Sequence, residues 1–306
     1  MSRNIHEGQF SGPRALRALL KYEPIVRCLG AHDVLSARLI EHAGLECLFI
    51  GGFGASASML GLPDMNFLTM NHMTDIARRI VQSVEIPVIV DGDTGHGDLH
   101  NVQLTVQQFE QVGAAGALLE DQITPKRCGH FAGKQVIPPK EMVLKIHAAL
   151  DVRKNPDFVL IARTDSRAVH GLEDAIERAQ MYAEAGADIC YIEAPQSVAE
   201  LSELPQRIDT PLMVNMLTGG QTPTQSVDDL RALGFKIVLW PIESVLCTAH
   251  IIKKLTRTLR ESGRVDSMIP EMETFQGIQN LLGLPDIMNL RTRMEERARR
   301  QEQQSK

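Results

Sequence analysis

Short apolar runs alternate with amphipathic runs along most of the chain. Each apolar run is bounded by polar residues or glycine, which is typical of the buried strands of a parallel sheet. Eight of these runs are predicted as strands: Ile25–Cys28, Cys47–Ile50, Pro87–Val90, Gly116–Leu119, Phe158–Ala162, Ile189–Ile192, Leu212–Val214 and Lys236–Leu239.

Helices are predicted between most of these strands. After Gly171, apolar residues recur on one face of a 3.6-residue period, at Leu172, Ala175, Ile176, Ala179 and Ala183. Glycine is the residue best suited to a left-handed helix cap, and it commonly stands just before the next strand, as at Gly44, Gly113, Gly186 and Gly234.

This repeated strand–helix unit predicts an α/β fold of the TIM-barrel type. The length of 306 residues is compatible with one barrel, since such barrels typically run to about 250 residues. We therefore expect a single barrel domain, with its core at about residues 23–265. The alternative is an open doubly wound sheet, for which Gly52-Phe53-Gly54 supplies only part of the usual glycine fingerprint.

The segment from about Pro270 to the C-terminus differs from the rest. A further amphipathic stretch is followed by Arg291–Lys306, which is rich in Arg, Glu and Gln. Two interpretations stay open for this run: a solvated helix face, or an arm that docks on a neighbouring subunit.

Composition narrows the class of protein. Hydrophobic residues make up 43% of the chain, enough for a large core, and the formal net charge is −6. An acidic chain does not attract nucleic acid or anionic membranes in bulk, so neither is an expected partner. We find no apolar run near the roughly 18 residues of a membrane span and no signal peptide. Five scattered cysteines complete the expectation of a cytoplasmic protein.

Five successive predicted strands end in ionisable or amide side chains. These are Asp91 and Asp93 after the third strand, Glu120 after the fourth, then Arg163, Glu193 and Asn215. In a TIM barrel the active site lies where the strands end, so we expect these groups to meet at one rim. A single polar strand end is explained by its reaching solvent, but five in succession favour a site.

The spacing of the acids indicates a metal ion. Asp91 and Asp93 are two apart in an extended segment, so their carboxylates point to one face and repel each other unless a cation lies between them. With Glu120 nearby the donors are all oxygen, which suits Mg²⁺ or Mn²⁺ rather than zinc, with some acids acting through water. Arg163 is expected to hold a substrate carboxylate with both arms of its guanidinium.

Cys128 stands in a polar loop with Lys126, Arg127 and His130. Neighbouring cationic side chains lower the pKa of a thiol, so Cys128 should give up a proton readily or attack as a thiolate. A zinc site made by Cys128 and His130 is the alternative, although no second Cys/His pair has ligand spacing.

The sequence Lys126-Arg127-Cys128-Gly129-His130 resembles the signature loop of the isocitrate lyase and phosphoenolpyruvate mutase superfamily. Further stretches resemble its motifs in the expected order: Ser58–Asp64, Asp91–Gly95, Leu119–Gln122, Ala162–Asp165 and Gly219–Pro223. The resemblance is closest to the branch of the 2,3-dimethylmalate lyases, 2-methylisocitrate lyases, petal-death protein and carboxyphosphonoenolpyruvate mutase.

The resemblance implies a barrel whose last helix, in an arm of about residues 266–306, is swapped between the subunits of a homotetramer. It implies metal-site roles for Asp64, Asp91, Asp93 and Glu120. It implies substrate contacts by Gly51, Gly52, Phe53, Gly129, Arg163 and Asn215. Catalytic roles are implied for Cys128, as proton donor, and for Lys126, His130, Arg163 and Glu193.

The resemblance also implies the reaction. A Mg²⁺-dependent lyase would cleave a small anionic 2-hydroxy di- or tricarboxylate by a retro-aldol step, giving a 2-oxo acid such as pyruvate and a carboxylate. Trp240 is expected to enlarge an apolar wall, which favours a compact substrate with an alkyl group. The alternatives are phosphonomutase C–P bond chemistry, hydrolysis of the C–C bond of oxaloacetate, and a non-catalytic metabolite-binding scaffold.

Overall fold

The structure, a computed structural model, describes residues 12–127, 129 and 133–304. The chain divides into two units. Among the described residues, the barrel unit extends through Thr248 and the C-terminal unit begins at Ala249. No helix in the described ranges combines the length and the apolarity needed to cross a bilayer.

The predicted barrel is confirmed, and the open-sheet alternative is wrong. Each strand pairs in parallel with the next, and the first also pairs with the eighth, which closes the sheet. The strands are β1 (Val26–Gly30), β2 (Cys47–Ile50), β3 (Val88–Asp91), β4 (Gly116–Glu120), β5 (Val159–Thr164), β6 (Ile189–Ile192), β7 (Leu212–Asn215) and β8 (Ile237–Trp240).

Several strands continue one or two residues beyond their predicted ends. Asp91 pairs with Leu118, Glu120 with Arg163, and Asn215 with Leu239. Polar side chains that the sequence placed just after the strands are therefore held by the backbone ladder itself. This fixes their positions more firmly than a loop would.

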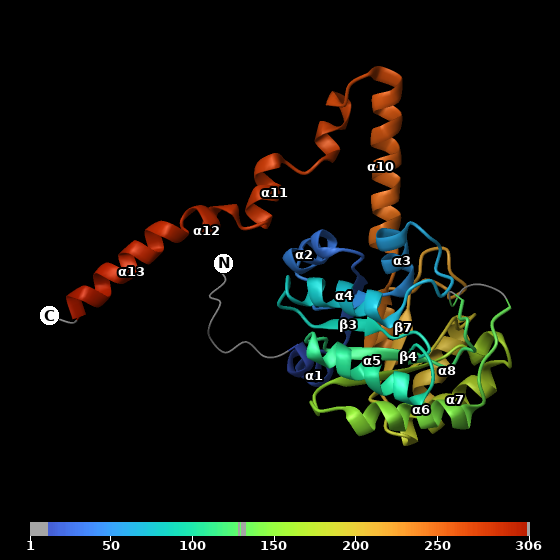
Figure 1. The fold of residues 1–306 in the computed structure, drawn as a ribbon. Coiled ribbons are helices and arrows are strands. Elements are labelled where there is room, and N and C mark those ends of the chain that lie inside the picture. The colour runs from blue at the N-terminus through green and yellow to red at the C-terminus, as the bar shows by residue number, and fades with distance from the viewer. Residues whose placement is uncertain (1–11, 128, 130–132, 305–306) are drawn as a thin grey trace. The chain divides into compact units, whose positions relative to one another are not determined.

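Helices surround the barrel strands (Figure 1). They are α1 (Gly12–Tyr22), α2 (Val34–His42), α3 (Gly52–Leu60), α4 (Met70–Val81), α5 (Leu99–Gln111), α6 (Pro139–Val152), the 3₁₀ turn η1 (Ser166–Ala168), α7 (Leu172–Glu184), α8 (Val198–Arg207), α9 (Val227–Leu233) and the start of α10 (Glu243–Ser262). The predicted helix after Gly171 is α7. Gly234 caps α9 with φ of 105°, in the left-handed region.

The core has two layers because side chains alternate along each strand. Inward-facing residues, such as Cys28, Phe49 and Tyr191, fill the barrel interior, where Leu16 of α1 joins them. Outward-facing residues pack against the helices. On β8, Leu239 belongs to the interior and Trp240 to the outer layer.

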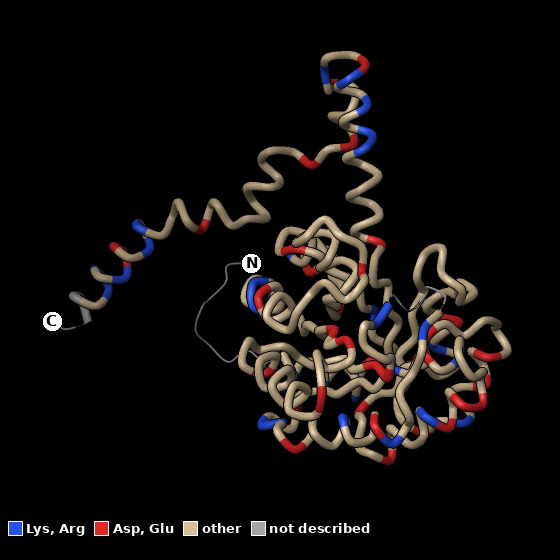
Figure 2. The backbone as a smooth tube through the Cα atoms, turned by 45° about the vertical axis from the view of Figure 1, so that its right-hand side comes forward, with Lys and Arg blue, Asp and Glu red and all other residues tan. Residues whose placement is uncertain are grey.

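The C-terminal unit contains the rest of α10 and four further elements: η2 (Asp266–Glu271), α11 (Phe275–Leu281), α12 (Leu284–Met288) and α13 (Leu290–Gln304). Acidic and basic residues are interspersed along α13, whereas the stretch before it is nearly uncharged (Figure 2). Residues 274–290 carry one charged side chain, Asp286.

Candidate active site

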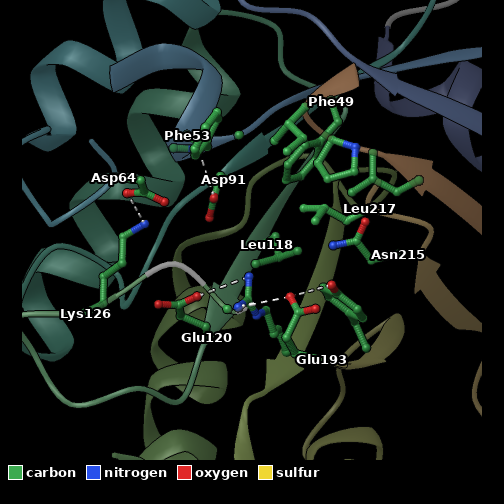
Figure 3. Close-up of a pocket in the computed structure, with 18 of the residues that line it drawn as sticks. Phe49, Phe53, Asp64, Asp91, Leu118, Glu120, Lys126, Glu193, Asn215 and Leu217 are labelled. Atoms are coloured by element: carbon green, nitrogen blue, oxygen red, sulfur yellow. Dashed lines mark hydrogen bonds and ion pairs between the residues drawn. The ribbon is translucent and has the colours of Figure 1, made fainter. Parts of the chain in front are cut away.

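A pocket of about 530 Å³ opens at the carboxyl ends of the strands. One side holds Asp64, Asp91 and Lys126, and the opposite side holds Phe49 and Leu217 (Figure 3). The lining includes most of the predicted site residues: Gly51, Gly52, Phe53, Asp64, Asp91, Glu120, Lys126, Gly129, Arg163, Glu193 and Asn215.

The four acids of the predicted metal site are all buried and surround Lys126. Its Nζ lies 2.7 Å from Asp64 Oδ1 and 2.7 Å from Asp93 Oδ1. Asp91 accepts hydrogen bonds from the backbone amides of Asp93, at 3.0 Å, and Gly52, at 3.2 Å. Lys126 therefore lies among the acids, and its predicted effect on the thiol of Cys128 stays a prediction because Cys128 lies outside the described residues.

The donors of this cluster fit a hard cation such as Mg²⁺. They are carboxylate oxygens, and Glu120 Oε1 is buried without a hydrogen-bond partner within the described chain. Within the described part of the chain, no three His, Cys, Asp or Glu side chains are arranged closely enough to hold a metal ion by themselves. Mg²⁺ keeps several waters and usually needs only one or two carboxylates, so the cluster fits a hydrated ion better than a fully protein-ligated one.

Burial sets the protonation of this cluster. It raises the pKa of Asp93 to about 7; the charge of Lys126 opposes the shift, and those of Asp91 and Asp64 reinforce it. Burial also raises the pKa of Glu120 well above its usual range, against the charge of Arg163. A cation bound here would favour the ionised forms of both groups.

Arg163 lies among three carboxylates. Its Nε and Nη2 donate to Asp165, at 2.9 and 3.0 Å. Nη2 also lies 3.0 Å from Glu193 Oε2, and Nη1 lies 3.4 Å from Glu120 Oε2. The sequence predicted that both arms hold a substrate carboxylate. In the structure the Nε–Nη2 edge holds Asp165 instead, which leaves the Nη1 side for a ligand.

The floor of the pocket contains a phenol that the sequence analysis missed. Tyr191 Oη donates to Glu193 Oε2 at 2.6 Å, and the Arg163 guanidinium lies 5.5 Å from the centre of the Tyr191 ring. Tyr191 stands two residues before Glu193, so the period of two along a strand was the available signal. Asp165, two residues after Arg163, carried the same signal and was also missed. Lys134, whose ammonium contacts Asp165, carries no such signal in the sequence.

The glycines of the site are required by close packing. Gly51 is the N-cap of α3 and Gly52 is its first residue, and the Gly52 amide donates to Asp91. A Cβ on Gly129 would lie 2.2 Å from Arg163 Nη2 and 2.7 Å from Glu193 Oε2. The backbone at Gly129 thus lies directly against the charged floor, and a side chain at this position would have to displace the ends of Arg163 and Glu193.

The backbone on both sides of Cys128 is anchored. The Gln122 side chain binds the N–H and the carbonyl of Arg127, at 3.0 and 2.9 Å. On the other side, Lys134 donates to the carbonyl of Gly129. Cys128 and His130 themselves lie outside the described residues, so their roles, and the zinc alternative, stay predictions.

The placement of Trp240 corrects one prediction. Its side chain packs in the outer layer between the strands and the helices and does not line the pocket. The inward neighbour on β8 is Leu239, which does line the pocket. Parity along the strand decides this, because successive side chains point to opposite faces.

Comparison with known proteins agrees with this geometry. The family described as phosphoenolpyruvate phosphomutase matches residues 16–260. The 2,3-dimethylmalate lyase of Eubacterium barkeri is 40% identical over 272 residues, covering 89% of this chain and 94% of that protein. A structure of oxaloacetate acetylhydrolase with the inhibitor 3,3-difluorooxalacetate matches with a TM-score of 0.89 and 34% identity, covering 94% of this chain and 99% of that one.

A structure of phosphonopyruvate hydrolase with oxalate and Mg²⁺ matches with a TM-score of 0.82 and 30% identity, covering 93% of this chain and 99% of that one. The resemblance to this superfamily is thus confirmed over most of the chain. This chain belongs to the phosphoenolpyruvate mutase family, within the superfamily that also holds isocitrate lyase.

Proposed function

We propose that this protein is a Mg²⁺-dependent carbon–carbon lyase that cleaves a small 2-hydroxy di- or tricarboxylate into a 2-oxo acid and a carboxylate. The observation that carries the proposal is one pocket with buried acids and Arg163 along one part and apolar side chains along another. The likeness to 2,3-dimethylmalate lyase supports the reaction class. The related hydrolase with oxalate and Mg²⁺ supports the cofactor.

The reaction requires two proton transfers. The C2 hydroxyl loses its proton to a carboxylate of the pocket, the adjacent C–C bond breaks, and the departing carbon takes up a proton from Cys128. Bound near Asp64, Asp91, Asp93 and Glu120, Mg²⁺ would supply positive charge for the oxygens of the 2-oxo acid. Cys128 directly precedes Gly129, whose backbone lies against Arg163 and Glu193.

The apolar part of the pocket favours an alkyl-bearing substrate. Phe49 and Leu217 lie opposite the acids (Figure 3), and Leu239, Pro241 and Ile242 extend this surface. A third carboxylate against these side chains would lose its water without gaining a cation. We therefore propose a compact alkyl-substituted malate rather than a tricarboxylate as the preferred substrate.

A panel of acids tests the function. Purified enzyme with Mg²⁺ is given 2,3-dimethylmalate, 2-methylisocitrate, isocitrate and oxaloacetate, and release of pyruvate, glyoxylate and oxalate is measured. We expect release of pyruvate, fastest from the dimethylmalate. Equal turnover of isocitrate and dimethylmalate would contradict the alkyl preference. Release of oxalate from oxaloacetate would assign a hydrolase, and ³¹P spectra with phosphonopyruvate would reveal a mutase.

Mg²⁺ affinity is expected to increase as the pH rises through about 7, because burial raises the pKa of Asp93 to about 7. Below that pH the Asp93 carboxyl holds a proton in the metal-free protein, and an incoming cation must displace it. Each displaced proton weakens binding by about tenfold per pH unit. Calorimetry at about pH 6 and about pH 8 measures this, with Asp93→Asn as the variant in which the dependence is weaker; Glu120, whose pKa burial also raises, keeps the remainder. Equal affinity at both pH values would contradict it.

The proposal includes a homotetramer with an exchanged arm, to which residues 266–306 belong. In the C-terminal unit Phe275, Ile287 and Met288 are 82%, 66% and 72% exposed. Large apolar side chains left this exposed commonly mark an interaction site, and a second copy of the chain is the partner proposed. Sedimentation should give a tetramer for the full chain and a smaller species after deletion of residues 266–306. A full chain that sediments as a monomer would refute the arm's role.

A further inference from the structure

A buried carboxylate, Asp165, joins the pocket arginine to a lysine that does not line the pocket. Asp165 Oδ2 accepts from Arg163 Nε at 2.9 Å, and Oδ1 accepts from Arg163 Nη2 at 3.0 Å and Lys134 Nζ at 2.7 Å. The Lys134 and Asp165 side chains are 2% and 0% exposed. Burying such a pair costs desolvation energy, so a stabilising role alone is a weak explanation for it.

The position of Asp165 is itself fixed by a hydrogen bond to Asp121. Its N–H donates to Asp121 Oδ1 at 3.0 Å. The other oxygen of Asp121 accepts from Thr164 Oγ1 at 2.7 Å and Tyr182 Oη at 2.8 Å. Asp165 is thus a fixed acceptor, whereas Arg163 has a long side chain with several rotatable bonds.

The direction of the Arg163 guanidinium depends on this acceptor. With Nε and Nη2 on Asp165, Nη1 turns toward Glu120 and the second hydrogen of Nη2 toward Glu193. Without Asp165, the planar fork is free to pair both of its arms with Glu120 or Glu193. That rotation would withdraw Nη1 from any ligand in the pocket.

Lys134 contributes in two ways. It offsets the charge of Asp165, which would otherwise add to the excess of buried acids around Arg163. It also donates to the Gly129 carbonyl, and Gly129 packs directly on Arg163 Nη2. Lys134 therefore links the backbone beside Cys128 to the carboxylate that aims Arg163.

We infer that Asp165 and Lys134 are positioning residues, which together fix the Arg163 guanidinium and the Gly129 backbone for the reaction in the pocket. The kinetic part of this inference rests on the proposed function; the geometric part does not. Neither residue is a catalytic residue, because neither lines the pocket.

Asp165→Asn and Lys134→Met test the inference. The amide nitrogen of Asn accepts no hydrogen bond, so it cannot replace either of the carboxylate oxygens that bind Arg163 and Lys134. Met keeps the length of Lys134 without its charge. We expect kcat to fall by about 10²-fold in each with a smaller change in KM, since a small misplacement of a catalytic group has an effect of this size. Lys134→Arg should recover part of the loss. The double variant should be no slower than Asp165→Asn alone.

Asp188→Asn is the matched control. Asp188 also holds two arginines, Arg17 at 2.7 Å and Arg153 at 2.8 Å, but it does not line the pocket. The Asp188→Asn substitution should lower the melting temperature and leave kcat unchanged. If Asp165→Asn fails to fold, the kcat of Lys134→Met tests the inference. Full kcat in folded Lys134→Met, or additive losses in the double variant, would overturn the inference.

Crystal structures of the variants give a readout independent of any substrate. We expect the Arg163 guanidinium to rotate in Asp165→Asn, so that Nη1 turns away from the pocket and the fork pairs with Glu120 or Glu193. An Arg163 in its original place in both variants would overturn the inference, whatever the reaction. A wild-type enzyme inactive on the whole acid panel, with a displaced Arg163 in the variants, would refute the proposed function and leave the inference standing.

Discussion

Arg163→Met is expected to abolish turnover and to lower the free energy of unfolding by about 3–5 kcal/mol, the usual effect of removing one partner from a buried ion pair. The substitution leaves three carboxylates, Asp165, Glu193 and Glu120, without the cation that lies among them. Chemical denaturation measures the stability, and the acid panel measures the turnover. A variant as stable as the wild type would show that Arg163 does not neutralise these acids.

The loss of stability in Arg163→Met should depend on pH. Burial already raises the pKa of Glu120, and the charge of Arg163 opposes that shift. Without Arg163 the pKa rises further, so the folded state binds a proton that the unfolded state has released. Stability of the variant therefore falls as the pH rises from about 5 to about 8. The opposite slope would contradict the assignment.

Arg163→Lys is the matched variant for separating charge from geometry. A lysine restores one positive charge but not the planar fork that contacts Asp165 along one edge. We expect it to recover much of the stability and little of the activity. Equal recovery of both would mean that the charge of Arg163, not its orientation, serves the reaction.

The fold was predictable because parallel strands buried on both faces leave a strong mark in a sequence. All eight apolar runs form strands, and β3, β4 and β7 end on the polar residues Asp91, Glu120 and Asn215. The convergence of these residues on one pocket follows from barrel topology, since every strand presents its carboxyl end to the same rim.

The errors came from details that a one-dimensional pattern does not contain. Trp240 was assigned to the pocket from its place at a strand end, but parity turns it outward and Leu239 inward. Arg163 was assigned two free arms, because nothing along the chain shows that Asp165 folds back onto one of them. Lys134 contacts Asp165, which is far from it in the sequence, and the apolar pattern does not specify this contact.

Lys126 has contacts that its neighbours in sequence did not indicate. Its neighbours in sequence suggested an effect on the Cys128 thiol, whereas its ammonium lies between Asp64 and Asp93. Burial disfavours the charged form of Lys126, but the surrounding acids, Asp93 foremost, raise its pKa well above the usual range. Lys126 therefore serves the charge balance of the acid cluster, and the chemistry of Cys128 must be tested separately.

Cys128→Ser is expected to lower kcat by about 10²–10⁴-fold, the usual contribution of a positioned proton donor. A serine hydroxyl is a much weaker acid than a cysteine thiol, so protonation of the carbon left by C–C cleavage would be slow. The substitution changes one atom, and the melting temperature should stay close to that of the wild type. Turnover of the best acid from the panel is the measurement.

Cys247→Ser is the control for general effects of removing a thiol. Cys247 is an exposed free cysteine near the start of α10 and does not line the pocket. Cys247→Ser should keep full activity. Iodoacetamide should inactivate the wild type and Cys247→Ser alike. Oxalate with Mg²⁺ should still bind Cys128→Ser, because the acids proposed to hold the ion are intact. If Cys128→Ser keeps a kcat within a few-fold of wild type, the proton comes from another group, and Tyr191, the phenol that lines the pocket floor, is the next to replace.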